Sequence, residues 1–134
     1  MFLHGVSIDF VNLRGDDYTE GNQGDMKIGS PEEDAYRRDL TFNSLFYNIN
    51  ENKIEDCTGK GIEDLENKIC RTPLDPLQTF LDDPLRVLRT IRFANRFEST
   101  IINDIMAAAQ NQDVRVRYSF TFIIIVGSII EIKY

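Results

Sequence analysis

The chain has 134 residues, 42% hydrophobic and 28% charged, which fits one small domain or a piece of a larger one and argues against intrinsic disorder. Its formal net charge of −7 argues against tight RNA or DNA binding by this chain alone, because Lys and Arg contacts to phosphates supply most of that affinity. Two cysteines and one histidine are too few for a structural zinc site. Two free buried thiols in a reducing compartment are expected in preference to a disulfide.

The N-terminal stretch predicts a strand followed by a loop. Residues 6–13, VSIDFVNL, alternate enough for a β-strand with Asp9 and Val11 on one face. The next stretch, RGDDYTEGNQGDMKIGS, is rich in Gly, Asp and Asn without periodicity, which is typical of a mobile loop. No basic segment followed by an apolar core opens the chain, so we expect no secretory signal there.

A helix start follows this loop. Ser30 is suited to the N-cap, Pro31 to the first helical position and Glu33 to the third position of a capping box. These signals predict a helix over about residues 31–43.

Shorter elements follow in the middle of the chain. Two apolar runs that flank residues 50–52 predict a β-hairpin. The stretch GIEDLENK then favours a short helical turn, and ICRT a short strand.

The segment DDPLRVLRTIRFANRF predicts a helix over about residues 83–97, with Pro84 in its first turn. Helical spacing places Val87, Ile91 and Ala94 on one side. Another side holds an arginine stripe, formed by Arg86, Arg89, Arg92 and Arg96. A second helix is expected at INDIMAAAQ.

The C-terminal residues have a different character. The apolar run from Phe120 to Ile130 is about 11 residues long, short of the ~18–20 that cross a bilayer. Because this run has few charges and high β propensity, we expect it to favour aggregation. No membrane contact is expected.

Four sets of polar residues are candidates for chemistry. Arginines offer donor forks for phosphates, Asp accepts from ribose hydroxyls and Asn does both, so one group could hold a nucleoside triphosphate. It consists of Arg37, Arg38, Asp39, Thr41 and Asn43. The simpler interpretation is a capped surface helix with ion pairs four residues apart, such as Asp34 with Arg38.

In the second group, Asp83 and Arg86 lie three residues apart and share a helix face, with an acceptor beside a donor fork. This arrangement matches the exocyclic amine and ring nitrogen of cytosine or adenine, although an ordinary ion pair at a helix start explains it too. The third candidate is Asp9, whose carboxylate could join a Mg²⁺ site, or simply be solvated. The arginine stripe could steer phosphates or contact acids of a neighbouring domain.

Four stretches in chain order form a recognisable set: EEDAYRRDLTFNSLFYNI, DCTGKGIEDL, CRTP and FLDDPLRVLRTIRFANRF. The set resembles the class II CCA-adding enzymes, which are tRNA nucleotidyltransferases, and their sister bacterial poly(A) polymerases, with the eukaryotic form most similar. The resemblance covers roughly residues 3–112, and it outweighs the simpler interpretations given above.

The resemblance implies a role for each candidate residue. Arg37, Arg38, Asp39, Thr41 and Asn43 match a motif that contacts the ribose and phosphates of the incoming nucleotide. Asp83 and Arg86 match a motif that pairs with CTP and then ATP, and Arg89 and Arg92 are expected to bind nucleotide from the same helix. Asp9 matches an acidic strand position that joins the catalytic metal ligands. Asp56, Gly59 and Asp64 fall in a motif that links head and neck.

The resemblance also implies an α+β fold: a partial polymerase-β-like nucleotidyltransferase head with an antiparallel sheet and helices, followed by an all-helical neck. We expect the head part at 1–72, the start of the neck at 73–113 and an aberrant hydrophobic tail at 114–134. The implied activity is template-independent transfer of CMP and AMP from CTP and ATP to tRNA 3′ ends, with Mg²⁺.

The family's Asp-x-Asp metal motif is missing from this sequence, so we expect the chain to be inactive by itself. A poly(A) polymerase and a non-catalytic nucleotide-binding or interaction module remain alternatives. The tRNA 3′ end would be bound through domains that the chain lacks, and an exposed sheet edge and the tail favour self-association. The resemblance leaves the compartment open among cytosol, nucleus, mitochondrion and plastid.

Overall fold

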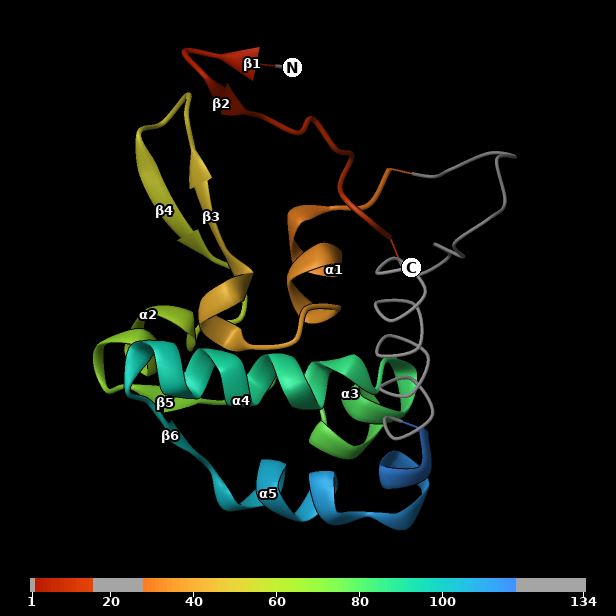
Figure 1. The fold of residues 1–134 in the computed structure, drawn as a ribbon. Helices are drawn as coiled ribbons and strands as arrows, with labels where there is room; N and C mark the ends of the chain where they lie inside the picture. Colours follow the sequence, from red (N-terminus) through yellow and green to blue (C-terminus); the bar gives the residue numbers. More distant parts are fainter. Residues whose placement is uncertain (1, 16–27, 118–134) are drawn as a thin grey trace.

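The computed structural model of the chain describes residues 2–15 and 28–117 (Figure 1). The helices are α1 (Pro31–Tyr36), α2 (Gly61–Glu66), α3 (Pro76–Asp82), α4 (Leu85–Phe97) and α5 (Asn103–Gln110), with a 3-10 helix η1 (Thr41–Ser44). The strands are β1 (Phe2–Leu3), β2 (Val6–Ser7), β3 (Leu45–Asn48), β4 (Lys53–Asp56), β5 (Ile69–Cys70) and β6 (Thr100–Ile101). They pair as antiparallel β1–β2, antiparallel β3–β4 and parallel β5–β6.

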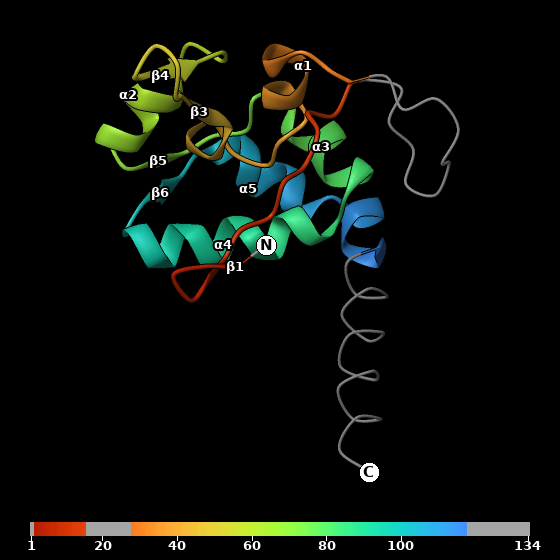
Figure 2. The ribbon, with the colours of Figure 1, turned by 90° about the horizontal axis from the view of Figure 1, so that it is seen from above.

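The elements are arranged around α4, which crosses the middle of Figure 1. The β3–β4 hairpin and α1 lie on one side of α4 and α5 lies on the other, while α3 packs against both α4 and α5. Figure 2 shows the same arrangement from above, with α3 joined to one end of α4. No helix among residues 2–15 and 28–117 is long and apolar enough to cross a membrane.

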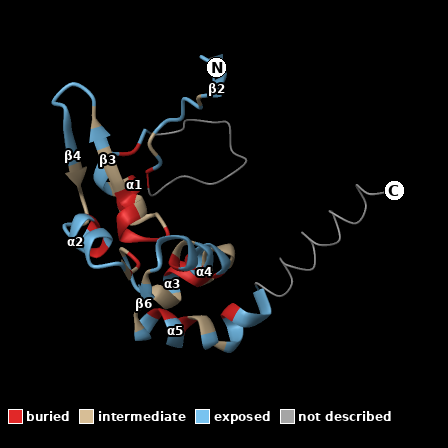
Figure 3. Cartoon of the chain, turned by 60° about the vertical axis from the view of Figure 1, so that its left-hand side comes forward, coloured by how far each residue is buried: buried red, intermediate tan, exposed pale blue. Residues whose placement is uncertain are grey.

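The buried core lies where these elements meet, and Figure 3 shows buried residues gathered on α1, α3, α4 and α5. The core side chains come from the α1–η1 segment, β5, α3 to α5 and the helical residues 112–117 that follow α5: Leu40, Phe42, Cys70, Phe80, Val87, Ala94, Ile105, Ala108 and Val114. Phe42 makes edge-to-face contacts with Phe93 and Phe97 of α4, at centroid distances of 6.2 and 5.8 Å. The segment that contains the first candidate group is therefore packed directly against the helix that contains the second.

The predicted capping box is confirmed, but the predicted helix over 31–43 is wrong in length. Glu33 N–H donates to Ser30 Oγ at 3.1 Å, and Ser30 N–H donates to the Glu33 carboxylate at 2.6 Å. The helix nevertheless ends at Tyr36. Leu40 takes an extended conformation, with φ −134° and ψ 147°, which places its side chain in the core and forces the chain out of the helix.

The hairpin, the short helical turn and the short strand are confirmed. β3 and β4 pair in the register Leu45↔Asp56 to Asn48↔Lys53, and Asn52 in the turn has a positive φ of 53°. α2 occupies the predicted turn, and β5 the predicted strand.

The helix over 83–97 and the one after it are confirmed as α4 and α5, but α3 was missed. Asp75 caps α3 by accepting a hydrogen bond from Gln78 N–H at 2.9 Å, and Pro76 follows at the first helical position. These are ordinary helix-start signals. The predicted apolar side of α4 is partly wrong, because Thr90 is buried and Ile91 is 54% exposed.

The strand predicted over 6–13 is also wrong beyond Ser7. β2 ends there, and residues 8–13 are not in a strand. Strands need pairing partners, and among the described residues β2 pairs only with the two residues of β1. Most of the predicted loop and the apolar run from Phe120 to Ile130 lie outside the described residues.

Candidate functional site

A cavity of about 480 Å³ lies between the segment that follows α1 and the start of α4. Five arginines and three aspartates are among its lining residues, so the site is locally cationic in a chain with a net charge of −7. It brings together seven of the predicted residues: Arg37, Arg38, Asp39, Asn43, Asp83, Arg86 and Arg89. The volume falls in the ~300–1,000 Å³ range of sites for small molecules and cofactors.

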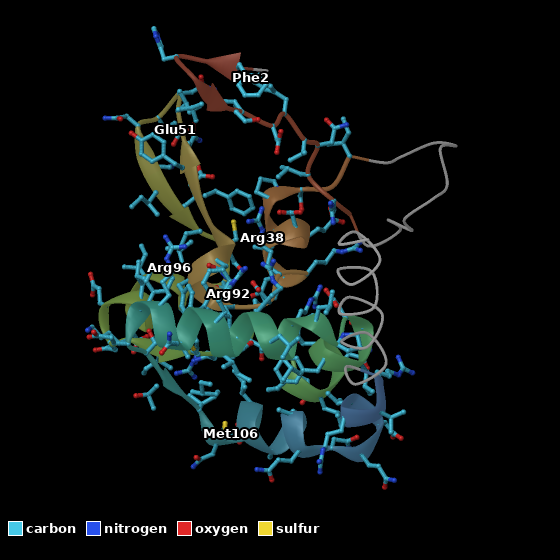
Figure 4. All side chains as sticks on the ribbon, viewed as in Figure 1. Phe2, Arg38, Glu51, Arg92, Arg96 and Met106 are labelled. Atoms are coloured by element: carbon cyan, nitrogen blue, oxygen red, sulfur yellow. The ribbon has the colours of Figure 1, made fainter. Side chains whose placement is uncertain are left out.

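Arg38 is held on one wall of the cavity by α1 (Figure 4). Its Nε and Nη2 atoms donate to Asp34 Oδ2 at 2.9 and 2.6 Å, and Nη1 donates to the Asn43 carbonyl oxygen at 3.0 Å. The guanidinium also lies 4.8 Å from the centroid of the Phe46 ring. The ion pair expected for a surface helix is therefore present, and it orients an arginine that faces the cavity.

Asp39 is the most buried predicted residue that lines the cavity, with 4% of its surface exposed. Its Oδ1 atom accepts from Leu40 N–H and from Asn43 Nδ2, both at 3.0 Å. Its Oδ2 atom accepts from Arg89 Nε at 2.6 Å. Arg37, the neighbouring lining residue, donates from its guanidinium to the carbonyl oxygen of Gly15.

Asp83 and Arg86 lie side by side, but they do not share a helix face as predicted, because Asp83 is extended (φ −143°, ψ 99°) and precedes α4. Asp83 Oδ2 is 3.9 Å from Arg86 Nε, and Asp83 Oδ1 accepts from Leu85 N–H at 3.0 Å. Arg86 Nη2 donates to the Arg37 carbonyl oxygen at 2.6 Å. Both side chains also line an adjoining cavity of about 760 Å³ beside Tyr36. An acceptor and a donor fork thus face open space together.

Three predicted residues do not line the cavity. Thr41 is buried, and its hydroxyl donates to Asp64 Oδ2 at 2.7 Å. Arg92 projects from α4 toward the hairpin side, with its guanidinium 4.8 Å from the Phe93 ring centroid (Figure 4). Asp9 is exposed and lies beyond β2.

The described residues do not fit a magnesium site. Asp9 is a single exposed carboxylate, and residues 2–15 and 28–117 contain no group of three or more His, Cys, Asp or Glu side chains that could hold a metal ion. A Mg²⁺ ion that binds phosphates usually needs one or two carboxylates held in place. Asp9 would therefore need further ligands beside it to hold such an ion.

Asp56 and the two free thiols, partly buried Cys57 and buried Cys70, have shifted pKa values. Burial raises the pKa of Asp56, but hydrogen bonds from Ile62 N–H, the Thr58 hydroxyl and Gly59 N–H outweigh it, so the pKa is lowered. Burial raises the pKa of Cys57, and the carboxylate of Glu55 raises it further. Burial, with the charge of Asp64, raises the pKa of Cys70 to about 11. A raised pKa disfavours the reactive thiolate form of both cysteines.

The sequence interpretation missed several residues of the site. Asp34 orients Arg38 and accepts from Arg14 N–H at 3.2 Å, and Asn12 and Leu13 complete the wall beside them. The four-residue spacing of Asp34 and Arg38 indicated their ion pair but not its place in a cavity. Nothing in the local sequence signals the contribution of residues 12–14, because they reach the site through the bridge between Arg14 and Ile28.

The chain matches known proteins over most of its length. Residues 3–71 match the family model described as the poly(A) polymerase head domain. The mitochondrial CCA tRNA nucleotidyltransferase of Saccharomyces cerevisiae is 52% identical over 87% of this chain and 22% of its own length. The tRNA nucleotidyltransferase cca1 of Schizosaccharomyces pombe is 48% identical over 86% of this chain and 23% of its own length.

A solved structure agrees with these sequence matches. The crystal structure of the Bacillus stearothermophilus CCA-adding enzyme in complex with CTP superimposes with a TM-score of 0.57 and 30% identity, covering 62% of this chain and 20% of that one. The chain thus spans about a fifth of the length of the relatives it matches. It belongs to the family of class II CCA-adding enzymes and poly(A) polymerases, and its mixed α/β fold is that of the nucleotidyltransferase head.

Proposed function

We propose that the cationic cavity binds the nucleoside triphosphate, and that the chain is the nucleotide-recognition part of a tRNA CCA-adding nucleotidyltransferase. The whole protein would transfer CMP and AMP from CTP and ATP to tRNA 3′ ends. The observation that supports this best is the meeting of two sequence groups, one after α1 and one around the start of α4, at a single cavity.

The side chains suit the parts of a nucleotide. The guanidinium groups of Arg37 and Arg38 are donor forks that match phosphate oxygens. The pair of Asp83 and Arg86 offers an acceptor beside donors, which matches the amine and ring nitrogen of cytosine and adenine. Uracil and guanine have a carbonyl at the position of that amine, so they would place an acceptor against a carboxylate. Thr41 would act indirectly, by fixing η1 through Asp64.

We further propose that the chain does not catalyse transfer alone. Phosphoryl and nucleotidyl transfer commonly uses metal ions held by several carboxylates. The full sequence contains no Asp-x-Asp motif, and the described residues do not build a magnesium site. The chain would contribute the Asp9 carboxylate to the metal site of the whole protein. Its proposed domain parts are the head at 1–72, the start of the neck at 73–113 and the hydrophobic tail at 114–134. Exposed apolar residues of the hairpin, such as Ile49 and Ile54, favour self-association.

Calorimetric titration of the purified chain with CTP, ATP, UTP and GTP in the presence of Mg²⁺ tests the binding proposal. CTP and ATP should bind at least about tenfold more tightly than UTP and GTP, because the latter leave a polar group mispaired. Asp83→Ala should remove this preference, whereas Asp104→Ala, an exposed aspartate of α5, should keep it. Equal binding of all four nucleotides would contradict the assignment of Asp83 and Arg86.

Incubation with labelled nucleotides and a tRNA that lacks its CCA end tests the catalytic proposal. No label should be transferred by the chain alone, and detectable transfer would overturn the proposed inactivity. ATP binding without CTP binding would favour a poly(A) polymerase, consistent with the 40% identity over 77 residues to poly(A) polymerase I of Salmonella typhi. The absence of binding by any nucleotide would overturn the proposed site itself.

A further inference from the structure

Arg89 contacts the buried Asp39 of the candidate site. Its Nε atom donates to Asp39 Oδ2 at 2.6 Å, and the two residues are 50 positions apart in the sequence. The Arg89 guanidinium is also packed 5.7 Å from the centroid of the Phe93 ring, which restrains it on α4. A short hydrogen bond between opposite charges is among the stronger polar contacts in proteins. Arg89 therefore restricts how the Asp39 carboxylate can turn.

The Asp39 carboxylate has most of its accepting capacity in use. A carboxylate offers about four acceptor sites. Two hydrogen bonds reach Oδ1, from Leu40 N–H and Asn43 Nδ2, and one reaches Oδ2, from Arg89. About one site on Oδ2 is therefore left for a donor that enters the cavity. A hydroxyl group supplies such a donor, whereas a phosphate oxygen supplies none and is repelled by the carboxylate.

We propose that Arg89 is a positioning residue that aims the remaining acceptor site of Asp39 at a ribose hydroxyl of the bound nucleotide. Arg89 would thereby set the selectivity for ribonucleotides without contacting the sugar. This inference rests on the proposed nucleotide site. Arg86 Nη2 donates separately to the Arg37 carbonyl oxygen at 2.6 Å, so α4 stays attached to residues 37–39 when Arg89 is replaced.

The test is a set of titrations of the purified chain with CTP, 2′-deoxy-CTP and 3′-deoxy-CTP in the presence of Mg²⁺. For the unmodified chain, one deoxynucleotide should bind about tenfold more weakly than CTP, because its missing hydroxyl leaves an acceptor unpaired. The identity of that nucleotide shows which hydroxyl Asp39 contacts. The ratio that decides is the dissociation constant of that deoxynucleotide divided by the dissociation constant of CTP. In Arg89→Ala this ratio should fall to near one, chiefly because CTP binds more weakly.

Further variants separate positioning from general damage to the fold. Arg89→Lys keeps the charge but lacks the planar fork, so the ratio should fall by a smaller factor. Adding Asp39→Asn to Arg89→Ala should lower the ratio no further, since both changes act on one interaction. Arg96→Ala is the matched control, because Arg96 also lies on α4 with its guanidinium near a phenylalanine ring, 5.6 Å from Phe97. It should keep the ratio.

Each alternative outcome gives a decision. If Arg89→Ala weakens CTP and deoxynucleotides equally, its role is structural, and the inference fails while the proposed site stands. The same holds if the unmodified chain does not distinguish CTP from either deoxynucleotide. If Arg89→Ala does not fold, an unchanged ratio in Arg89→Lys overturns the inference. If the unmodified chain binds no nucleotide, the proposed function fails and the inference fails with it.

Discussion

Residues 37–43 and residues 2–15 both contain predicted site residues, but the structure holds them very differently. In the first segment, Leu40 is fully buried and Asp39 is 4% exposed. In the second, Phe10 and Val11 are 80% and 82% exposed, and only the two residue pairs of β1 and β2 form a sheet. Figure 3 shows the same contrast between the interior and the N-terminal end.

The difference lies in where each segment finds its partners. Residues 37–43 are fixed by contacts to α2, to Arg71 just after β5 and to α4, which lie within the described chain. Asp9 has a strand-like sequence but lies outside any strand. The proposed nucleotide site is thus held in place by the described residues themselves, whereas the proposed metal-binding role of Asp9 would need contacts that they do not provide.

Phe80→Ala should produce the largest effect on stability. Phe80 is fully buried on α3, so its truncation should lower the free energy of unfolding by about 3–5 kcal/mol. Phe10→Ala removes the same side chain from an exposed position and should change it by less than about 0.5 kcal/mol. Urea unfolding followed by circular dichroism measures both. Similar losses would mean that the N-terminal segment is packed after all.

Asp64→Ala should rank second. The buried Asp64 carboxylate accepts from Thr41 Oγ1 at 2.7 Å and from Arg71 Nε at 3.1 Å. Its removal leaves two polar partners without their acceptor, and because Arg71 is partly solvated we expect a loss of about 2 kcal/mol. Glu63→Ala, an exposed neighbour on α2, is the control in the same unfolding assay. A loss confined to the control level would show that η1 is held by its packing alone.

The predictions from sequence succeeded where the signals are local. The capping box of Ser30 and Glu33, the turn of the hairpin and the arginine-rich helix α4 all depend on residues within a few positions of each other. The candidate groups are likewise continuous motifs, and their roles stay predictions. That most of their residues line one cavity could not be derived from spacing.

The sequence predictions were wrong where contacts between residues far apart in the sequence determine the local structure. The helix over 31–43 is interrupted because Leu40 enters a core shared with α4, and because Asp39 turns toward Arg89. Thr41 was grouped with its neighbours, yet its hydroxyl points to Asp64 on α2. The strand over 6–13 has the right alternation but no described partner beyond β1. Periodicity indicates which residues suit an element, whereas pairing determines whether it forms.

Ser30→Ala should have a smaller effect than either core change. It removes the hydrogen bond that caps α1 and should lower the free energy of unfolding by about 1 kcal/mol. Ser7→Ala replaces an exposed serine of β2 and should change it by less than about 0.5 kcal/mol. The urea midpoints of the two variants measure how much more stability the cap of α1 contributes than the exposed serine of β2. A larger loss for Ser7→Ala would reverse the ranking of the two regions.

Asp56→Asn should have the smallest effect, and one that depends on pH. The hydrogen bonds from Ile62 N–H and the Thr58 hydroxyl outweigh burial and hold the pKa of Asp56 below its usual 3.8. A lowered pKa in the folded chain contributes stability that is present above pH 3.8 and is lost as the pH falls through the folded value. The variant should therefore be less stable by under about 1 kcal/mol at pH 7, since the site is partly solvated. This difference should shrink below about pH 4 in urea unfolding. A constant difference across pH would mean that the turn is stabilised by the shape of the side chain and not by its charge.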